Sequence, residues 1–192
     1  MKNASVQKIA EILRILVLIT FICNLVALLL VPGLVYFRSD IAHRIEFSHL
    51  QRIFNYDFDD GLGRLLGIYL TEVWKEPYTA ALTLFLLFSG ICTAVILLQA
   101  IRVLCTIVEG NRNPFTLENA ASLRRAALCC FLIAAAALAR VIFSVCYYRS
   151  PLPLATYNAL FVPMFAMGGL LCLVMSALFR QAAELKAEND LT

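Results

Sequence analysis

A single arginine, Arg140, lies inside the long apolar run between Ala126 and Tyr148. A charge at that depth of a bilayer costs about 2.5–3.5 kcal/mol on insertion scales, so the side chain must face protein or water. Such a cation can bind an anionic ligand or a lipid headgroup. It can also act as a structural anchor, with its long side chain reaching the membrane surface. The sequence leaves both roles open.

Neutral polar side chains in the other apolar runs are the expected companions of this arginine, because those runs contain no acidic residue. The predicted intramembrane polar site, and ligand candidate, consists of Arg140, Asn24, Gln99 and Asn158. An alternative set of partners is the acidic cluster of a polar loop, formed by Asp57, Asp59 and Asp60.

Other motifs typical of metal binding or catalysis are incomplete or absent. The segment 57–63 resembles a calcium loop, but the glycine and the acid that an EF-hand needs at its sixth and twelfth positions are missing. His43 and His49 lack the spacing of a helical zinc pair and have no cysteine nearby. No hydrolase, zinc-protease, Walker or dinucleotide motif occurs. We therefore expect no metal, no cofactor and no enzymatic activity.

Seven cysteines lie in or beside the apolar runs, and none forms a Cys-x-x-Cys pair. The odd count argues against a disulfide framework, and the spacing argues against a zinc site. Packing as small apolar residues between helices explains them. The adjacent Cys129 and Cys130 are also candidates for redox chemistry or acylation.

Helices that cross a bilayer must position these residues. Of the 192 residues, 61% are hydrophobic and only 15% are charged, and the mean hydropathy is +0.82. These values exclude a soluble globule and a disordered chain. A spanning helix needs about 20 mainly apolar residues, and four runs qualify, at 15–37, 77–101, 126–148 and 151–179. The prediction is one all-α domain over residues 1–192, an integral membrane four-helix bundle.

Two features of the outer part of this bundle can be predicted. Pro32 falls inside the first span, where a proline is expected to kink the helix or end it early. The loop 38–76 is expected to contain an interfacial amphipathic helix over 62–76, because its apolar residues recur at helical spacing. Trp74 and Tyr78 are of the type that favours the membrane interface.

The distribution of basic residues predicts the orientation. Four spans place both termini on one side, together with the loop 102–125 and the tail 180–192. This side carries nine lysines and arginines, against six on the side of the loop 38–76. By the positive-inside rule, both termini are expected in the cytoplasm.

The loop 102–125 contains the sharpest local pattern. Asn113 and Pro114 favour a turn, after which Thr116 is expected to cap a helix that continues into the third span. Capping explains these residues structurally, and docking of a partner is the alternative. The candidate cytoplasmic motif consists of Asn113, Pro114, Phe115, Thr116, Asn119, Leu123 and Arg124 in the loop, with Glu184, Leu185, Glu188, Asn189 and Asp190 in the tail.

These two segments resemble those of a bacterial membrane family known as domain of unknown function 2975. Residues 113–125 look like its Asn-Pro-Phe-Thr…Asn…Leu-Arg segment, and the tail is similar to its terminal Leu-x-x-Glu-Asn-Asp-Leu-Thr motif. The resemblance implies a multi-pass protein of the bacterial plasma (inner) membrane. Members are often encoded beside a small helix-turn-helix regulator, which suggests regulation.

The function expected from the sequence is regulatory or sensory, through a cytoplasmic partner such as a small helix-turn-helix regulator. The net charge of +3 is too small to predict direct binding of nucleic acid. The alternative is a small transporter, export or immunity component that acts on a membrane-active compound. Small-residue surfaces such as Gly168 and Gly169 favour close helix packing within the lipid bilayer and are compatible with a homo-oligomer.

Overall fold

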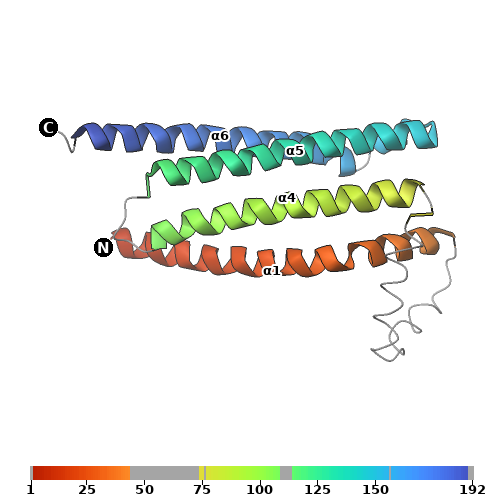
Figure 1. The fold of residues 1–192 in the computed structure, drawn as a ribbon, viewed down its shortest axis with the longest axis horizontal. Helices are drawn as coiled ribbons and strands as arrows, with labels where there is room; N and C mark the ends of the chain where they lie inside the picture. Colours follow the sequence, from red (N-terminus) through yellow and green to blue (C-terminus); the bar gives the residue numbers. More distant parts are fainter. Residues whose placement is uncertain (1, 44–73, 76, 109–113, 156, 190–192) are drawn as a thin grey trace, which may run out of the picture. The chain divides into compact units, whose positions relative to one another are not determined.

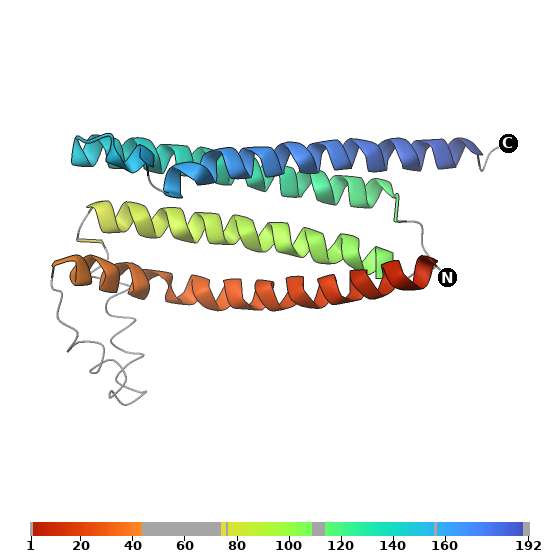
Figure 2. The same cartoon turned by 180° about the vertical axis from the view of Figure 1, so that it is seen from behind.

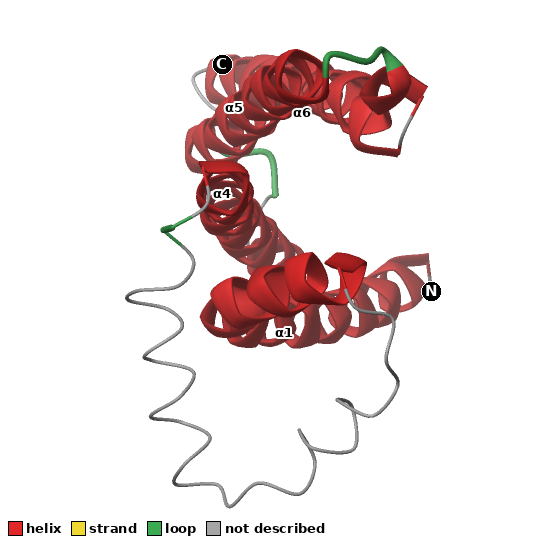
Figure 3. Cartoon of the chain, turned by 90° about the vertical axis from the view of Figure 1, so that its right-hand side faces the viewer, coloured by secondary structure: helices red, strands yellow, loops and turns green. Residues whose placement is uncertain are grey.

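The computed structural model describes residues 2–43, 74–75, 77–108, 114–155 and 157–189. It contains the helices α1 (Lys2–His43), α4 (Pro77–Val108), α5 (Leu117–Tyr148) and α6 (Tyr157–Asn189), with a short 3-10 helix, η2 (Leu152–Ala155), before α6 (Figure 1). The described residues include no strand (Figure 3). The predicted all-α class is therefore confirmed.

Length and surface character make this a membrane bundle. Each of the four long helices is long and apolar enough to cross a bilayer. Large apolar side chains such as Leu29, Leu171 and Met167 are exposed on α1 and α6. Water would solvate such continuous apolar faces poorly, whereas lipid chains cover them without penalty. The prediction of an integral membrane helix bundle is thus confirmed.

The chain divides into two compact units. The first comprises Met1–Leu25 and Ser89–Thr192, and so contains all of α5, η2 and α6. The second comprises Val26–Phe88. In the second unit, Thr79 and Thr83 are buried on α4, and the hydroxyl oxygen of Thr83 has no hydrogen-bond partner.

Helix α5 carries most of the buried surface of the first unit. Its buried positions recur every three or four residues and are mainly small: Asn119, Ala120, Ser122, Ala126, Ala127, Cys130, Ile133, Ala134, Ala137, Val141 and Ser144. Helices α5 and α6 run side by side (Figures 1 and 2). Small residues let helix backbones approach closely in a membrane, which explains why alanine, serine and cysteine dominate this surface.

One close approach between these helices is visible at Gly169. A Cβ atom built there would lie 3.0 Å from the ring of Phe131, whereas a Cβ at the preceding Gly168 would meet nothing within 4 Å. A methyl group at 169 would therefore fit only if the ring of Phe131 moved by a few tenths of an ångström.

Pro32 does not end the first helix early, one of the two outcomes that the sequence left open, and a kink at this position stays a prediction. Helix α1 continues through this position to His43. A proline removes one backbone hydrogen bond, but surrendering all later bonds would cost far more in an apolar environment, so transmembrane helices tolerate it. Pro163 is accommodated inside α6 in the same way.

The predicted amphipathic helix over 62–76 lies outside the described residues, apart from a turn at Trp74 and Lys75. The acidic cluster of Asp57, Asp59 and Asp60 also lies outside them, as does His49. Trp74 is exposed.

Candidate functional site

The start of α5 is organised as the sequence predicts. Thr116 is the N-cap, with extended backbone angles (φ −124°, ψ 154°), and its hydroxyl accepts a hydrogen bond of 3.2 Å from the backbone N–H of Asn119. Glu118 lies in the first turn, where its negative charge suits the positive end of the helix dipole. The predicted capping role of Thr116 is confirmed.

Asn119 extends this cap to the preceding helix. Its side chain is only 2% exposed, and its Nδ2 donates hydrogen bonds to Oγ1 of Thr106 at 2.8 Å and to the carbonyl of Pro114 at 2.7 Å. Thr106 in turn donates to the carbonyl of Val103. Both amide protons are thus used, and the side chain ties the end of α4 to the beginning of α5.

Helix α6 is attached at the same place. The hydroxyl of Ser176 donates a hydrogen bond of 2.7 Å to the carbonyl of Ala120. The rings of Phe115 and Phe179 meet edge to face, with centroids 5.0 Å apart. We call the contacting set the Asn119 junction: Thr106, Pro114, Phe115, Thr116, Asn119, Ala120, Ser176 and Phe179. It connects α4, α5 and α6.

The candidate motif omits four members of this junction: Thr106, Ala120, Ser176 and Phe179. Thr106 and Ser176 are hydroxyl residues within apolar helices, where a bond to the residue's own helix is the ordinary expectation. Their partners lie 13 and 56 residues away, and no pattern in the sequence indicates these pairings.

The part of α6 beyond Phe179 projects past the junction. This C-terminal extension, residues 180–189, is about 15 Å long at the rise of an α-helix. Arg180 and Glu184 form an ion pair of 2.8 Å on it, and Leu185 is 61% exposed. Glu188 and Asn189 are also exposed, whereas Asp190 and Asn113 lie outside the described residues.

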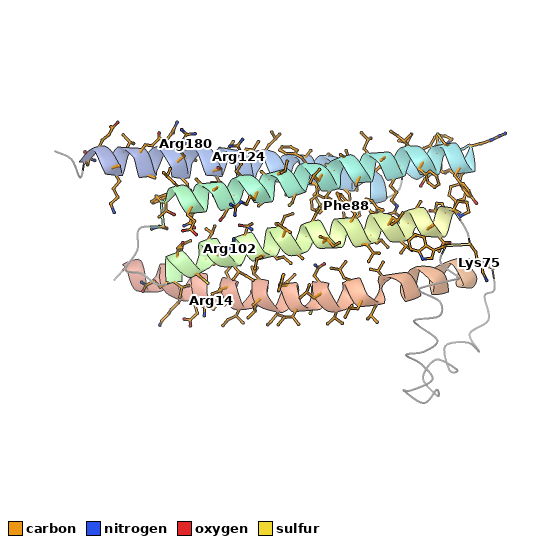
Figure 4. The ribbon with its side chains drawn as sticks, viewed as in Figure 1. Arg14, Lys75, Phe88, Arg102, Arg124 and Arg180 are labelled. Carbon is orange, nitrogen blue, oxygen red and sulfur yellow. The ribbon has the colours of Figure 1, made fainter. Side chains whose placement is uncertain are left out.

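The remaining candidate residues of the cytoplasmic motif lie on α5. Leu123 is half-buried and Arg124 is exposed. Arg14, Arg102, Arg124 and Arg180, all in the first unit, gather toward one end of its helices (Figure 4).

The intramembrane candidates occupy different depths. Asn24 donates from Nδ2 to the carbonyl of Gly90, joining α1 to α4 at 3.0 Å. Gln99 is only 5% exposed and its Oε1 has no hydrogen-bond partner. Gln99 lies nine residues beyond Gly90, or about 13 Å further along the helix. These two amides therefore belong to different levels of the bundle.

Arg140 is half-buried on α5 and has interaction partners in the structure. Measured from the bond between Thr106 and Asn119, Gln99 lies about 10 Å along α4 and Arg140 about 31 Å along the antiparallel α5. The two are thus separated by about 20 Å of depth. The side chain of Asn158 lies outside the described residues.

The cysteines show an arrangement that the spacing could not indicate. The adjacent Cys129 and Cys130 face different helices: Cys129 interacts with Cys92 of α4, and Cys130 interacts with Cys172 of α6. All four are free thiols. Among the described residues, no group of three or more His, Cys, Asp or Glu side chains is placed to hold a metal ion.

Taken together, the four long apolar helices define a multi-pass α-helical membrane protein, with a polar junction where α4, α5 and α6 meet. The chain belongs to the family described as "Protein of unknown function (DUF2975)", whose sequence profile matches residues 65–192. Both resembling segments, 113–125 and the tail, fall inside this match. No curated protein and no solved structure matches the chain.

Proposed function

We propose that this chain is a regulatory or sensory protein of the bacterial plasma membrane, without enzymatic activity, that binds a cytoplasmic protein through the C-terminal extension. A small helix-turn-helix regulator is the kind of partner expected. The observation that carries the proposal is the exposed helix that continues past the Asn119 junction with Leu185 uncovered.

The extension has the features of a docking helix. Isolated helices of this length are marginal in water, but this one continues a helix that is already formed. Leu178 and Leu185 are exposed and lie seven residues apart, on the same face. Helices that dock into a groove present apolar residues at such spacing, flanked by charges. The ion pair between Arg180 and Glu184 supplies such charges.

The orientation required by this proposal rests on the arginines. Arg14, Arg102, Arg124 and Arg180 gather at the end of the first unit that bears the extension (Figure 4). Arginine-rich ends face the cytoplasm under the positive-inside rule. The extension then reaches the compartment in which a transcription regulator is found.

A sensory role also needs a connection between the membrane helices and the extension. Ser176 and Phe179, at the base of the extension, contact Ala120 and Phe115 at the start of α5. A displacement of α5 along α6 would therefore shift the residues from which the C-terminal extension begins. This contact gives a physical route from a signal in the membrane to the partner.

Site-specific photo-crosslinking in living cells tests the proposal. A photoreactive residue replaces Leu185 in one variant and Met167, a lipid-exposed position of the same helix, in a matched control. We expect a soluble protein to be captured at 185 and not at 167. Once purified, that protein should bind the full chain in nanodiscs and should not bind the chain truncated after Phe179.

Capture of the same proteins at both positions, or binding that survives the truncation, would contradict the docking proposal. Specific capture of a transport component at 185 would favour the alternative of a transport, export or immunity role.

A further inference from the structure

Four arginines of the first unit lie at nearly one depth. The bond between Thr106 and Asn119 places these two residues at the same level of the antiparallel α4 and α5. Arg102 precedes Thr106 by four residues, and Arg124 follows Asn119 by five, so they lie about 6 and 8 Å from that level. Arg125 follows directly on α5.

Helix α1 adds the fourth member. The bond between Asn24 and Gly90 aligns α1 with α4, which runs in the opposite direction. Arg14 lies ten residues before Asn24, and Arg102 lies twelve residues after Gly90, which correspond to about 15 and 18 Å along the two helices. We call Arg14, Arg102, Arg124 and Arg125 the arginine belt.

The positive charge of the belt is not neutralised by the described part of the chain. Arg102, Arg124 and Arg125 are exposed and Arg14 is half-buried. The nearest described acids along the helices, Glu11 and Glu118, form no ion pair with them, whereas Arg180 is paired with Glu184. Among the described residues, these arginines are therefore available to external anions.

The depth of the belt corresponds to lipid headgroups. Tyr147 and Tyr148 contact each other and are exposed near the far end of α5, and such residues favour the membrane interface. Tyr147 lies 23 residues beyond Arg124, which is about 35 Å along the helix. The hydrocarbon core of a bilayer is about 30 Å thick. When the tyrosines lie at one interface, the belt therefore lies among the headgroups of the other.

We infer that the arginine belt binds the phosphodiester headgroups of anionic phospholipids, such as phosphatidylglycerol, in the leaflet at this end of the helices. A guanidinium presents a planar fork of donors that can form two parallel hydrogen bonds with phosphate oxygens. The exposed apolar side chains Leu13, Leu16 and Leu128 lie beside the belt and would contact the acyl chains. The inference is independent of the proposed cytoplasmic partner.

Lipid retention tests this inference directly. The full chain is reconstituted in vesicles of equimolar phosphatidylglycerol and phosphatidylcholine and extracted, and the retained lipids are counted by native mass spectrometry. We expect phosphatidylglycerol to predominate. Each arginine near an anionic surface contributes roughly a fivefold preference, so Arg102→Gln with Arg124→Gln should lower the ratio about 25-fold.

Two controls isolate the belt. Arg180→Gln removes a charge that is already paired, at the same end of the protein, and should leave the ratio unchanged. Arg102→Lys with Arg124→Lys keeps the charge, tests whether the fold is intact, and should restore most of the preference.

An equal ratio for wild type and the double glutamine variant, or an equal loss for Arg180→Gln, would overturn the inference. Displacement of phosphatidylglycerol by millimolar inorganic phosphate would also overturn it and indicate a soluble anion.

Discussion

The side-chain amide of Asn119 and the hydroxyl of Thr106 are joined by a 2.8 Å hydrogen bond that closes the hairpin between α4 and α5. The same nitrogen also holds the carbonyl of Pro114. One buried side chain thus fixes two helices and the turn before the second, at the level where α6 attaches through Ser176.

Replacing Asn119 by leucine should destabilise the protein by about 1–3 kcal/mol, because the substitution removes two hydrogen bonds of a buried side chain. Thermal unfolding in nanodiscs measures the loss. Ala121→Ser, at an exposed position two residues away, is the matched control and should stay within about 0.5 kcal/mol of the wild type. Equal stability of Asn119→Leu and the control would show that the junction contributes nothing.

A double-mutant cycle separates the two bonds of Asn119. Thr106→Val removes the bond between helices, together with the bond from Thr106 to the carbonyl of Val103, and keeps the bond from Asn119 to Pro114. If the two side chains interact as described, Thr106→Val should cost less in the Asn119→Leu background than in the wild type, with a coupling energy of about 0.5–3 kcal/mol. Strict additivity of the two free-energy changes would contradict the contact.

The N-cap makes a separate prediction. Thr116→Ala should cost about 1 kcal/mol, because the N–H of Asn119 loses its acceptor at the start of α5. Thr116→Ser retains a hydroxyl and should recover most of that loss. Amide hydrogen exchange at the first turn of α5 provides the measurement, with faster exchange expected for alanine alone. Equal exchange rates for the two variants would exclude capping by this side chain.

The contacts of this fold differ in whether they can be predicted from the sequence. The cap at Thr116 could be predicted because donor and acceptor lie three residues apart. The four spans could be predicted because length and apolar character suffice. The hydrogen bonds from Asn24 to Gly90 and from Ser176 to Ala120 could not be predicted. The two residues of each bond lie 66 and 56 positions apart, and the acceptor in each is a backbone carbonyl. A carbonyl is present at every position, so composition carries no information about which one is used.

The continuation of α1 through Pro32 has a physical reason that sequence rules leave out. Propensity rules describe a helix in water, where a broken end is solvated at little cost. In a membrane, each freed backbone group would remain unsatisfied, so α1 continues through the proline.

The two adjacent glycines of α6 should respond in opposite ways to alanine. At Gly169 the new methyl group would press on the ring of Phe131 at 3.0 Å, and such overpacking costs about 1–3 kcal/mol. At Gly168 nothing lies within 4 Å, and alanine should stabilise the helix by about 0.5–1 kcal/mol. Unfolding of both variants provides the measurement. Gly169→Ala with Phe131→Leu should regain part of the loss, and equal effects at the two glycines would refute the close approach.

Gln99 is a buried amide whose hydrogen bonding, unlike that of Asn119, is incomplete. Its Oε1 is buried without a partner, which is a cost to the folded state of about 1–3 kcal/mol. Gln99→Leu should therefore be neutral or stabilising in an unfolding experiment. A gain in stability accompanied by loss of a cellular phenotype would mark Gln99 as a functional polar group. Strong destabilisation would mean that the amide has a structural role that the hydrogen bonds do not reveal.

A stability measurement can also distinguish a structural role of Arg140 from a ligand-binding role. The guanidinium is half-buried and has partners within the protein, so Arg140→Leu should destabilise the fold by about 1–3 kcal/mol. Arg140→Lys, which keeps the charge, should lose less, and Leu138→Ile, at an exposed position of the same helix, should change little. A binding arginine behaves oppositely, since removing a cation held in apolar surroundings for a ligand stabilises the empty protein. Thermal unfolding of the three variants in nanodiscs therefore decides between an anchor and a ligand site, and a more stable Arg140→Leu would establish the second.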